Sequence, residues 1–235
     1  MRLHRALAAF VFPVLLAAAC AEHAPPPEKP AAPVATATAV VVVERPAVEA
    51  TPVPAAPVAP ADRGAGAYPG FHVPAFKATV RRPSSSGVTE QPFDSRATAK
   101  PTLYVINSSR CPTCVQYAGR EKALEAKYMP LGVDVVHVYP NRKEPADEKA
   151  AWHAKQGFLG GQIVDADASI ARSLEVERTP TVYLVSATGV IVYRGGIDGN
   201  AFEKPGEPFE PWAADAIEAH LAGRPIADDT TEPSG

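Results

Sequence analysis

Cysteine is scarce in this sequence, which places only Cys20, Cys111 and Cys114 among its 235 residues. Three cysteines cannot form the dense set of disulfides that holds a small secreted scaffold together, so a disulfide framework is excluded. No second Cys-x-x-Cys pair exists, and the six histidines do not stand at the spacing of a zinc site. The cysteines therefore indicate a local site rather than a scaffold.

Neither sign of charge is in large excess. The formal net charge is −3, and charged residues make up 21% of the chain. A nucleic-acid-binding protein needs a concentration of basic side chains, which this balance does not supply. We therefore expect no nucleic acid among the partners.

The apolar run at the start of the chain is too short for an ordinary membrane-spanning helix. It covers Ala6 to Ala19, 14 residues, and follows Arg2 and Arg5. A positive stretch before a short apolar run is typical of an export signal. We therefore expect the protein to be exported.

The small residues just before Cys20 resemble a bacterial lipoprotein signal. The resemblance implies a signal peptide of residues 1–19, a lipid anchor on Cys20 and attachment to the membrane of the cell envelope. If Cys20 carries lipid, Cys111 and Cys114 can pair only with each other. The alternative is an ordinary secretory signal cut after Ala19, which would leave Cys20 free.

Aromatic residues are absent from residues 21–67, while 16 of the 26 prolines lie at or before Pro101. A segment rich in Ala, Pro and Val without aromatics cannot bury enough apolar surface to offset the loss of chain entropy. Residues 20–70 are therefore predicted to be a disordered linker with polyproline II character. Such a linker would hold the folded domain away from the membrane.

The pattern Cys111-Pro112-Thr113-Cys114 stands between a short apolar run at 102–106 and a helical pattern at 115–128. A Cys-x-x-Cys at a strand-to-helix junction indicates a thiol–disulfide redox site. The spacing puts both sulfurs on the first helical turn, where unpaired N–H groups and the helix dipole favour a thiolate. Pro112 suits a helix start, and Arg110 is expected to add a positive charge beside the nucleophile.

The remaining sequence predicts strands and helices in the order β-α-β-α-α-β-β-α. Residues 71–100 allow a hairpin with a turn at 81–87, and Gly157 and Gly223 follow the ends of two predicted helices. The predicted strands are 102–106, 133–139, 181–186 and 190–193, and the predicted helices are 115–128, 145–156, 168–174 and 211–221.

This order, with Cys-x-x-Cys at the first strand–helix junction, resembles the thioredoxin fold in the branch of TlpA-like reductases and redoxins. Three further segments carry the resemblance: Arg178 to Val185, the hairpin Ala187 to Asp198, and the insert Val164 to Leu174. The resemblance implies an α/β, three-layer fold with a central mixed β-sheet and helices on both faces. It would occupy residues 71–224, with a flexible tail at 225–235.

The resemblance implies a thiol–disulfide oxidoreductase that acts on protein thiols and disulfides. Cys111 is expected to attack a partner disulfide, and Cys114 is expected to resolve the mixed disulfide. The direction of electron flow depends on the reduction potential, which the dipeptide Pro112-Thr113 influences. No cofactor and no metal are expected.

The segment Thr179-Pro180 resembles the loop whose proline is cis and faces the active site. The resemblance implies that the backbone of Thr179 turns toward the sulfurs. There it could hydrogen-bond an extended partner segment, as an added strand does.

Two positions depart from thioredoxin itself. Arg110 stands where thioredoxin has Trp, and Val105 stands where thioredoxin has a buried acid on the strand. Proton transfer from the resolving cysteine would then fall to water or to another group. His137 and His153 follow the cysteines in the sequence. His137 is expected inside a buried strand, and His153 is expected on an exposed helix face.

Three other interpretations stay open at this stage. A redoxin-type peroxidase would use Cys111 against a peroxide, and Ser108 stands three residues before it, where such sites place a hydroxyl. A non-catalytic module could bind a soft ion such as Cu(I) through Cys111 and Cys114. The two thiols could also be buried without a role.

Overall fold

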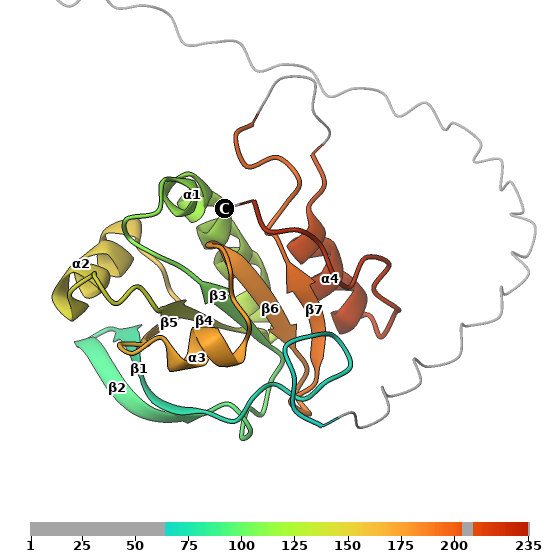
Figure 1. The fold of residues 1–235 in the computed structure, drawn as a ribbon, viewed down its shortest axis with the longest axis horizontal. Helices are drawn as coiled ribbons and strands as arrows, with labels where there is room; N and C mark the ends of the chain where they lie inside the picture. Colours follow the sequence, from blue (N-terminus) through green and yellow to red (C-terminus); the bar gives the residue numbers. More distant parts are fainter. Residues whose placement is uncertain (1–63, 204–208, 235) are drawn as a thin grey trace, which may run out of the picture. The chain divides into compact units, whose positions relative to one another are not determined.

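The computed structural model describes residues 64–203 and 209–234, which fold around one seven-stranded sheet (Figure 1). The predicted signal peptide, Cys20 and the linker up to residue 63 lie outside the described residues. The strands are β1 (Lys77–Ser84), β2 (Gly87–Asp94), β3 (Thr102–Ile106), β4 (Asp134–Tyr139), β5 (Gly161–Val164), β6 (Thr181–Val185) and β7 (Ile191–Gly195). The helices are α1 (Pro112–Tyr128), α2 (Ala146–Gln156), α3 (Ser169–Ser173) and α4 (Trp212–Leu221), with a short 3₁₀ helix η1 (Met129–Leu131) after α1.

The sheet is mixed, as predicted. Its strand order is β2-β1-β5-β4-β3-β6-β7, with β3, β4 and β5 parallel and all other neighbours antiparallel. Every residue of β3 and β6 is buried, because strands at the centre of a covered sheet are apolar on both faces. The chain leaves the carboxyl end of β3 directly into the loop that carries Cys111.

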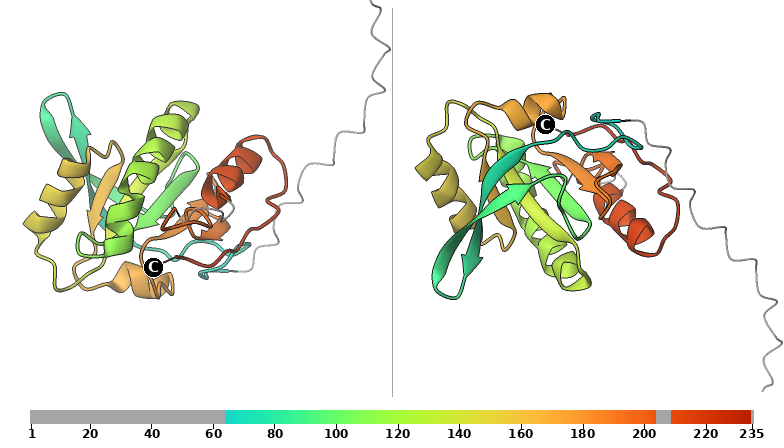
Figure 2. Two further views of the ribbon diagram at one scale, coloured as in Figure 1. Left: turned by 90° about the horizontal axis from the view of Figure 1, so that it is seen from above. Right: turned by 90° about the horizontal axis from the view of Figure 1, so that it is seen from below.

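Helices cover both faces of the sheet, which confirms the predicted three layers (Figure 2). On one face, Leu103 and Val105 pack in a core with Tyr117 of α1 and Ile217 of α4. α2 lies beside α1 on this same face (Figure 2). On the other face, Tyr104 and Ile106 of β3 pack with α3 residues and with the segment before β1; this second core includes Val73, Ile170 and Leu174.

Two details of the predicted elements differ from the structure. β5 was not predicted, because the four residues Gly-Gln-Ile-Val are too few to show the apolar pattern of a strand. They form a strand by pairing with the backbone of β4. The hairpin of β1 and β2 is present, but its turn is only Ser85-Ser86, not 81–87. β1 continues through Pro83, beyond the two residues, Val80 and Arg81, that pair with β5.

Segments at both ends of the described chain pack against β7. Ala67, in the stretch that we assigned to the linker, is buried, and the Gly70 N–H donates to the Ile191 carbonyl. Near the other end, Thr230 bridges to Arg194, and the hydroxyl groups of Thr231 and Tyr193 lie 2.7 Å apart. The end of the predicted linker, at residues 67–70, and part of the predicted tail, at residues 230–231, therefore contact the folded domain.

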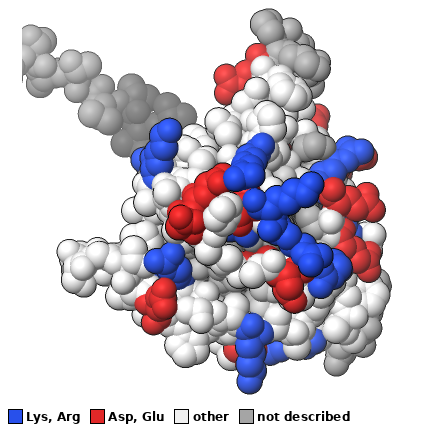
Figure 3. All heavy atoms as spheres, turned by 60° about the vertical axis from the view of Figure 1, so that its left-hand side comes forward, with Lys and Arg blue, Asp and Glu red and all other residues white. Residues whose placement is uncertain are grey.

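The surface carries charges of both signs. Lys and Arg side chains lie next to Asp and Glu side chains on the face in Figure 3. One of the ion pairs in the described residues joins Arg82 of β1 to Asp134 of β4, with 2.7 Å between nitrogen and oxygen. Within residues 64–203 and 209–234, none of the helices is long and apolar enough to cross a bilayer.

Candidate active site

Cys111 is the N-cap residue of α1. Its backbone is extended, with φ −83° and ψ 119°, and Pro112 begins the helix. The Cys111 sulfur accepts a hydrogen bond from the Cys114 N–H, with 3.4 Å between Sγ and N. A helix N-terminus leaves such N–H groups without backbone partners, so they are free to stabilise a thiolate.

The Cys111 sulfur also contacts Thr179, in the loop before β6. The Thr179–Pro180 peptide bond is cis, as the resemblance implied, and the Cys111 thiol donates to the Thr179 carbonyl at 3.2 Å. Thr179 and Cys111 are thus brought together from segments 68 residues apart. Both cysteines are free thiols; Cys111 is half-buried and Cys114 is fully buried.

The two thiols differ sharply in acidity. A hydrogen bond with the Cys114 thiol is the largest cause that lowers the pKa of Cys111 to about 5; the Thr179 side chain and backbone N–H groups lower it further, and burial opposes them. Burial is the largest cause that raises the pKa of Cys114 well above its ordinary value. Cys111 is therefore the ionised, accessible sulfur at neutral pH, and Cys114 is the protonated, inaccessible one.

Arg110 does not add its charge to the thiolate as we expected from the sequence. Its guanidinium donates to both carboxylate oxygens of Glu148 on α2, at 2.7 and 2.5 Å. The positive charge is thus paired on the surface, and the Cys114 thiol, the Thr179 side chain and the backbone N–H groups of the helix terminus are what stabilise the Cys111 thiolate. Arg110 instead links the loop before Cys111 to α2.

A buried carboxylate that the sequence did not reveal holds this same loop. Glu144 lies in the connection between β4 and α2 and is 4% exposed. It accepts hydrogen bonds from the Ser108 hydroxyl at 2.5 Å, from the Arg110 N–H at 3.1 Å and from the Ser109 N–H at 3.3 Å. The Ser108 hydroxyl is therefore bound to Glu144, so it does not serve Cys111 as the peroxidase interpretation requires.

The Glu144→Gln variant is expected to lower the free energy of unfolding by about 1–3 kcal/mol, because an amide cannot accept all of these bonds. Urea titration of the reduced protein measures the loss. Glu148→Gln is the matched control, since it removes the same charge from an exposed ion pair and should cost less. Equal effects from both variants would contradict the role of Glu144 in holding the loop.

A hollow of about 340 Å³ is lined by Thr179, whose carbonyl lies 3.2 Å from the Cys111 sulfur, although neither cysteine lines the hollow itself. It is bordered by Ser108 of the loop before Cys111 and by Thr179 of the cis-proline loop, and α3 and the β4–α2 connection complete its walls. Thr179 thus both lines this hollow and contacts the Cys111 sulfur. The other lining residues are Pro140, Asn141, Ala168, Ala171, Arg172, Val176, Glu177 and Arg178.

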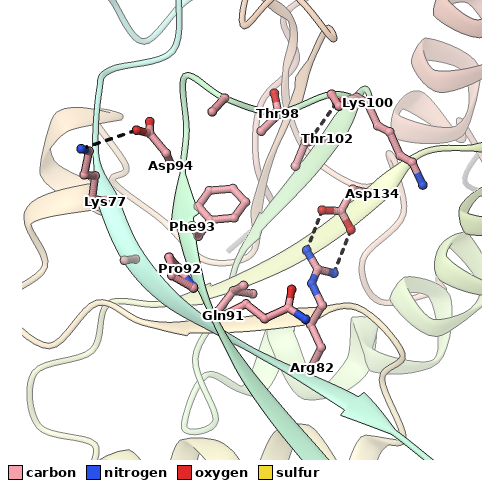
Figure 4. Close-up of a pocket in the computed structure, with 14 residues that line it drawn as sticks. Lys77, Arg82, Gln91, Pro92, Phe93, Asp94, Thr98, Lys100, Thr102 and Asp134 are labelled. Atoms are coloured by element: carbon pink, nitrogen blue, oxygen red, sulfur yellow. Dashed lines mark hydrogen bonds and ion pairs between the residues drawn. The ribbon is translucent and has the colours of Figure 1, made fainter.

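A larger hollow of about 700 Å³ lies at the other end of the sheet, where β3 and β4 begin (Figure 4). Thr102 and Asp134, the first residues of these strands, line it. Arg82 donates two hydrogen bonds to Asp134 across it, and Lys77 lies 3.8 Å from Asp94. It is therefore remote from Cys111, which follows the opposite end of β3.

Behind the cysteines, α1, α2 and β4 enclose a group of polar side chains. His137 is fully buried, as predicted, and its Nε2 lies 2.8 Å from Glu125 Oε1. His153 was predicted on an exposed face, which is wrong: it is 5% exposed, and its Nδ1 lies 2.9 Å from the Tyr139 hydroxyl. Among the described residues, no group of three or more His, Cys, Asp or Glu side chains could hold a metal ion.

Comparisons with known proteins agree with this architecture. The family model described as Redoxin matches residues 69–201. An uncharacterised conserved protein from Geobacillus kaustophilus has a TM-score of 0.59 at 20% identity, over 69% of this chain and 86% of that chain. A hypothetical protein from Sinorhizobium meliloti has a TM-score of 0.56 at 22% identity, over 70% of this chain and 90% of that chain. The comparison with curated proteins gave no match. The thioredoxin-like fold is confirmed.

Proposed function

The chain belongs to the Redoxin family, and from that premise we propose that it is a thiol–disulfide oxidoreductase exchanging the Cys111–Cys114 disulfide with protein partners. The observation that carries this proposal is the contrast between the two sulfurs. One is half-exposed with a pKa lowered to about 5, and the other is buried with a raised pKa. A pair built this way attacks through one thiol and resolves through the other.

The proposed exchange proceeds in two displacement steps. The Cys111 thiolate attacks one sulfur of a partner disulfide, a mixed disulfide forms, and the other partner sulfur leaves as a thiolate. Cys114 then loses its proton and attacks the Cys111 sulfur, so that the Cys111–Cys114 bond forms and the second partner sulfur is released. Two electrons pass to the partner; the reverse sequence oxidises it.

The hollow lined by Thr179 supports a polypeptide as the substrate. An extended segment in it would pass Thr179, whose backbone lies against the reactive sulfur. Backbone hydrogen bonds to Thr179 would hold the segment without regard to its side chains, as in strand addition. The partner class is therefore disulfide-bonded or dithiol proteins.

The N-terminal region gives the proposed enzyme its location. Residues 1–19 would direct export, Cys20 would carry lipid, and the linker that follows would tether the domain to the membrane. A polyproline II chain extends about 3.1 Å per residue, so a tether of this length would reach on the order of 100 Å. The domain would then serve partners in the cell envelope.

The Cys114→Ser variant tests the proposal directly. Without the resolving thiol, reduced protein mixed with a disulfide-bonded model protein is expected to accumulate a covalent complex through Cys111, seen as a mass increase that dithiothreitol reverses. The double variant Cys111→Ser, Cys114→Ser is the control and should form none. Failure of Cys114→Ser to form any complex would rule out exchange with protein disulfides.

A further inference from the structure

One basic side chain lies where the hollow lined by Thr179 meets the C-terminal end of the described chain. Arg178 directly precedes Thr179, whose carbonyl lies 3.2 Å from the Cys111 sulfur, and it lines the same hollow. The Arg178 side chain is 50% exposed. A partner segment that passes Thr179 would therefore run beside the guanidinium group of Arg178.

The charges around this hollow favour an acidic partner segment. Three charged residues line it; Arg172 and Arg178 are basic, and Glu177 is acidic. Two further basic residues, Arg142 and Lys143, are exposed and follow the lining residues of the β4–α2 connection in the sequence. Positive charge is thus in excess at the place proposed for the partner, and complementary charge on a partner increases the rate of encounter and the specificity.

Arg178 holds a carboxylate in this structure. Its Nη1 lies 3.3 Å from Oε1 of Glu232, whose side chain is 81% exposed. Arg172, by contrast, donates to the backbone carbonyl of Asp167. An ion pair as exposed as that of Arg178 and Glu232 contributes little to stability, because water screens both charges. A carboxylate of another chain can therefore replace Glu232 at a small cost in free energy.

The residues just before Glu232 place it at this position. The Arg194 N–H donates to the Asp229 carbonyl at 2.9 Å, and the Thr231 N–H donates to the Arg194 carbonyl at 3.0 Å. A Cβ atom at Gly195 would overlap Thr231 Oγ1, so the glycine lets the tail lie against β7. Because the backbone is fixed up to its neighbour, the Glu232 carboxylate stays at a high local concentration near Arg178.

We propose that Arg178 selects partner segments that carry Asp or Glu within about two residues of the reacting cysteine, and that Glu232 occupies Arg178 until such a segment binds. This inference rests on the proposed oxidoreductase function and names the substrate class of its site. An extended segment rises about 3.3 Å per residue, so a carboxylate one or two residues from the cysteine is within reach of the side chain that precedes Thr179. The planar guanidinium group suits a carboxylate, with which it can form two parallel hydrogen bonds.

Two short peptides, each closed by an internal disulfide, test this selection. In one peptide Glu flanks a cysteine on both sides, and in the other Gln takes both places. The second-order rate constant for reduction of each peptide by the reduced protein is measured by acid quench and mass spectrometry. Each is divided by the rate constant with dithiothreitol, which removes the peptide's own reactivity. The Glu-to-Gln ratio is expected to be about three, and to fall to about one in about 1 M salt.

Two variants remove the two members of the ion pair separately. Arg178→Gln is expected to bring the ratio to about one, whereas Glu232→Gln is expected to raise it about twofold, because the competing carboxylate is gone. Lys127→Gln is the matched control. It removes a cation from the exposed ion pair with Glu218 in the last turn of α1, at the opposite end of the helix from Cys111, and should leave the ratio at about three.

The opposite signs expected from the two variants separate selection from a structural role. If the ion pair only held the tail, Arg178→Gln and Glu232→Gln would change the ratio alike or leave it unchanged, and either result would overturn the inference. A wild-type ratio of about one at low salt would overturn it as well. Failure of the proposed function looks different, because the protein would then reduce neither peptide.

Discussion

Cys111→Ser is expected to lose disulfide exchange by on the order of 10³-fold or more, because a serine hydroxyl is not ionised at neutral pH and cannot replace a thiolate nucleophile. Thiol release from a disulfide-bonded model protein, with dithiothreitol as the reductant, measures the rate. The variant should fold, since the change is nearly isosteric at a half-buried position.

Cys20→Ser in the full chain is the matched control for this loss. It makes the same chemical change at the cysteine to which we assign the lipid anchor, so it should alter membrane attachment and leave the exchange rate of the detergent-solubilised protein unchanged. If Cys111→Ser kept more than about a tenth of the wild-type rate, another group would have to be the nucleophile. Loss of exchange in Cys20→Ser would equally contradict the separation of anchor and site.

The parts of the site that are contiguous in the chain could be predicted from the sequence. Cys111, Pro112 and Cys114 form a complete local pattern, since a helix start supplies its own N–H groups. Thr179-Pro180 was found through its resemblance to a known loop, and the contact with Cys111 agrees. The central strands were predictable because burial on both faces leaves a continuous apolar run.

The buried polar residues near the cysteines could not be predicted, because their burial depends on segments that meet only in the fold. Glu121 stands between Arg120 and Lys122, a pattern typical of a solvated helix face, yet it is enclosed by β4 and the loop at Asn107. Glu144 precedes a helix like many surface acids and becomes buried only because the Ser108–Arg110 loop folds over it. His153 was misassigned for the same reason.

The acidity of Cys111 gives the second large expected effect. With a pKa of about 5, the sulfur is almost entirely thiolate at pH 7, whereas at the ordinary value of 9.0 only about 1% would be, a difference on the order of 100-fold. Because the pKa is lowered, the reactive form persists to lower pH. Alkylation of the reduced protein by iodoacetamide should therefore be constant above about pH 6 and fall about tenfold per pH unit below 5.

The variant Cys114→Ala shows which interaction causes this acidity. The hydrogen bond with the Cys114 thiol is the largest cause of the lowered pKa, so a methyl group, which cannot donate, should raise the midpoint of the alkylation profile without abolishing the reaction. Mass spectrometry after alkylation should find the label on Cys111 alone in the folded wild-type protein, because Cys114 is fully buried. A wild-type midpoint near pH 9 would mean that the Cys114 thiol, the Thr179 side chain and the helix terminus do not stabilise the thiolate. The division of roles between the two sulfurs would then lose its physical basis.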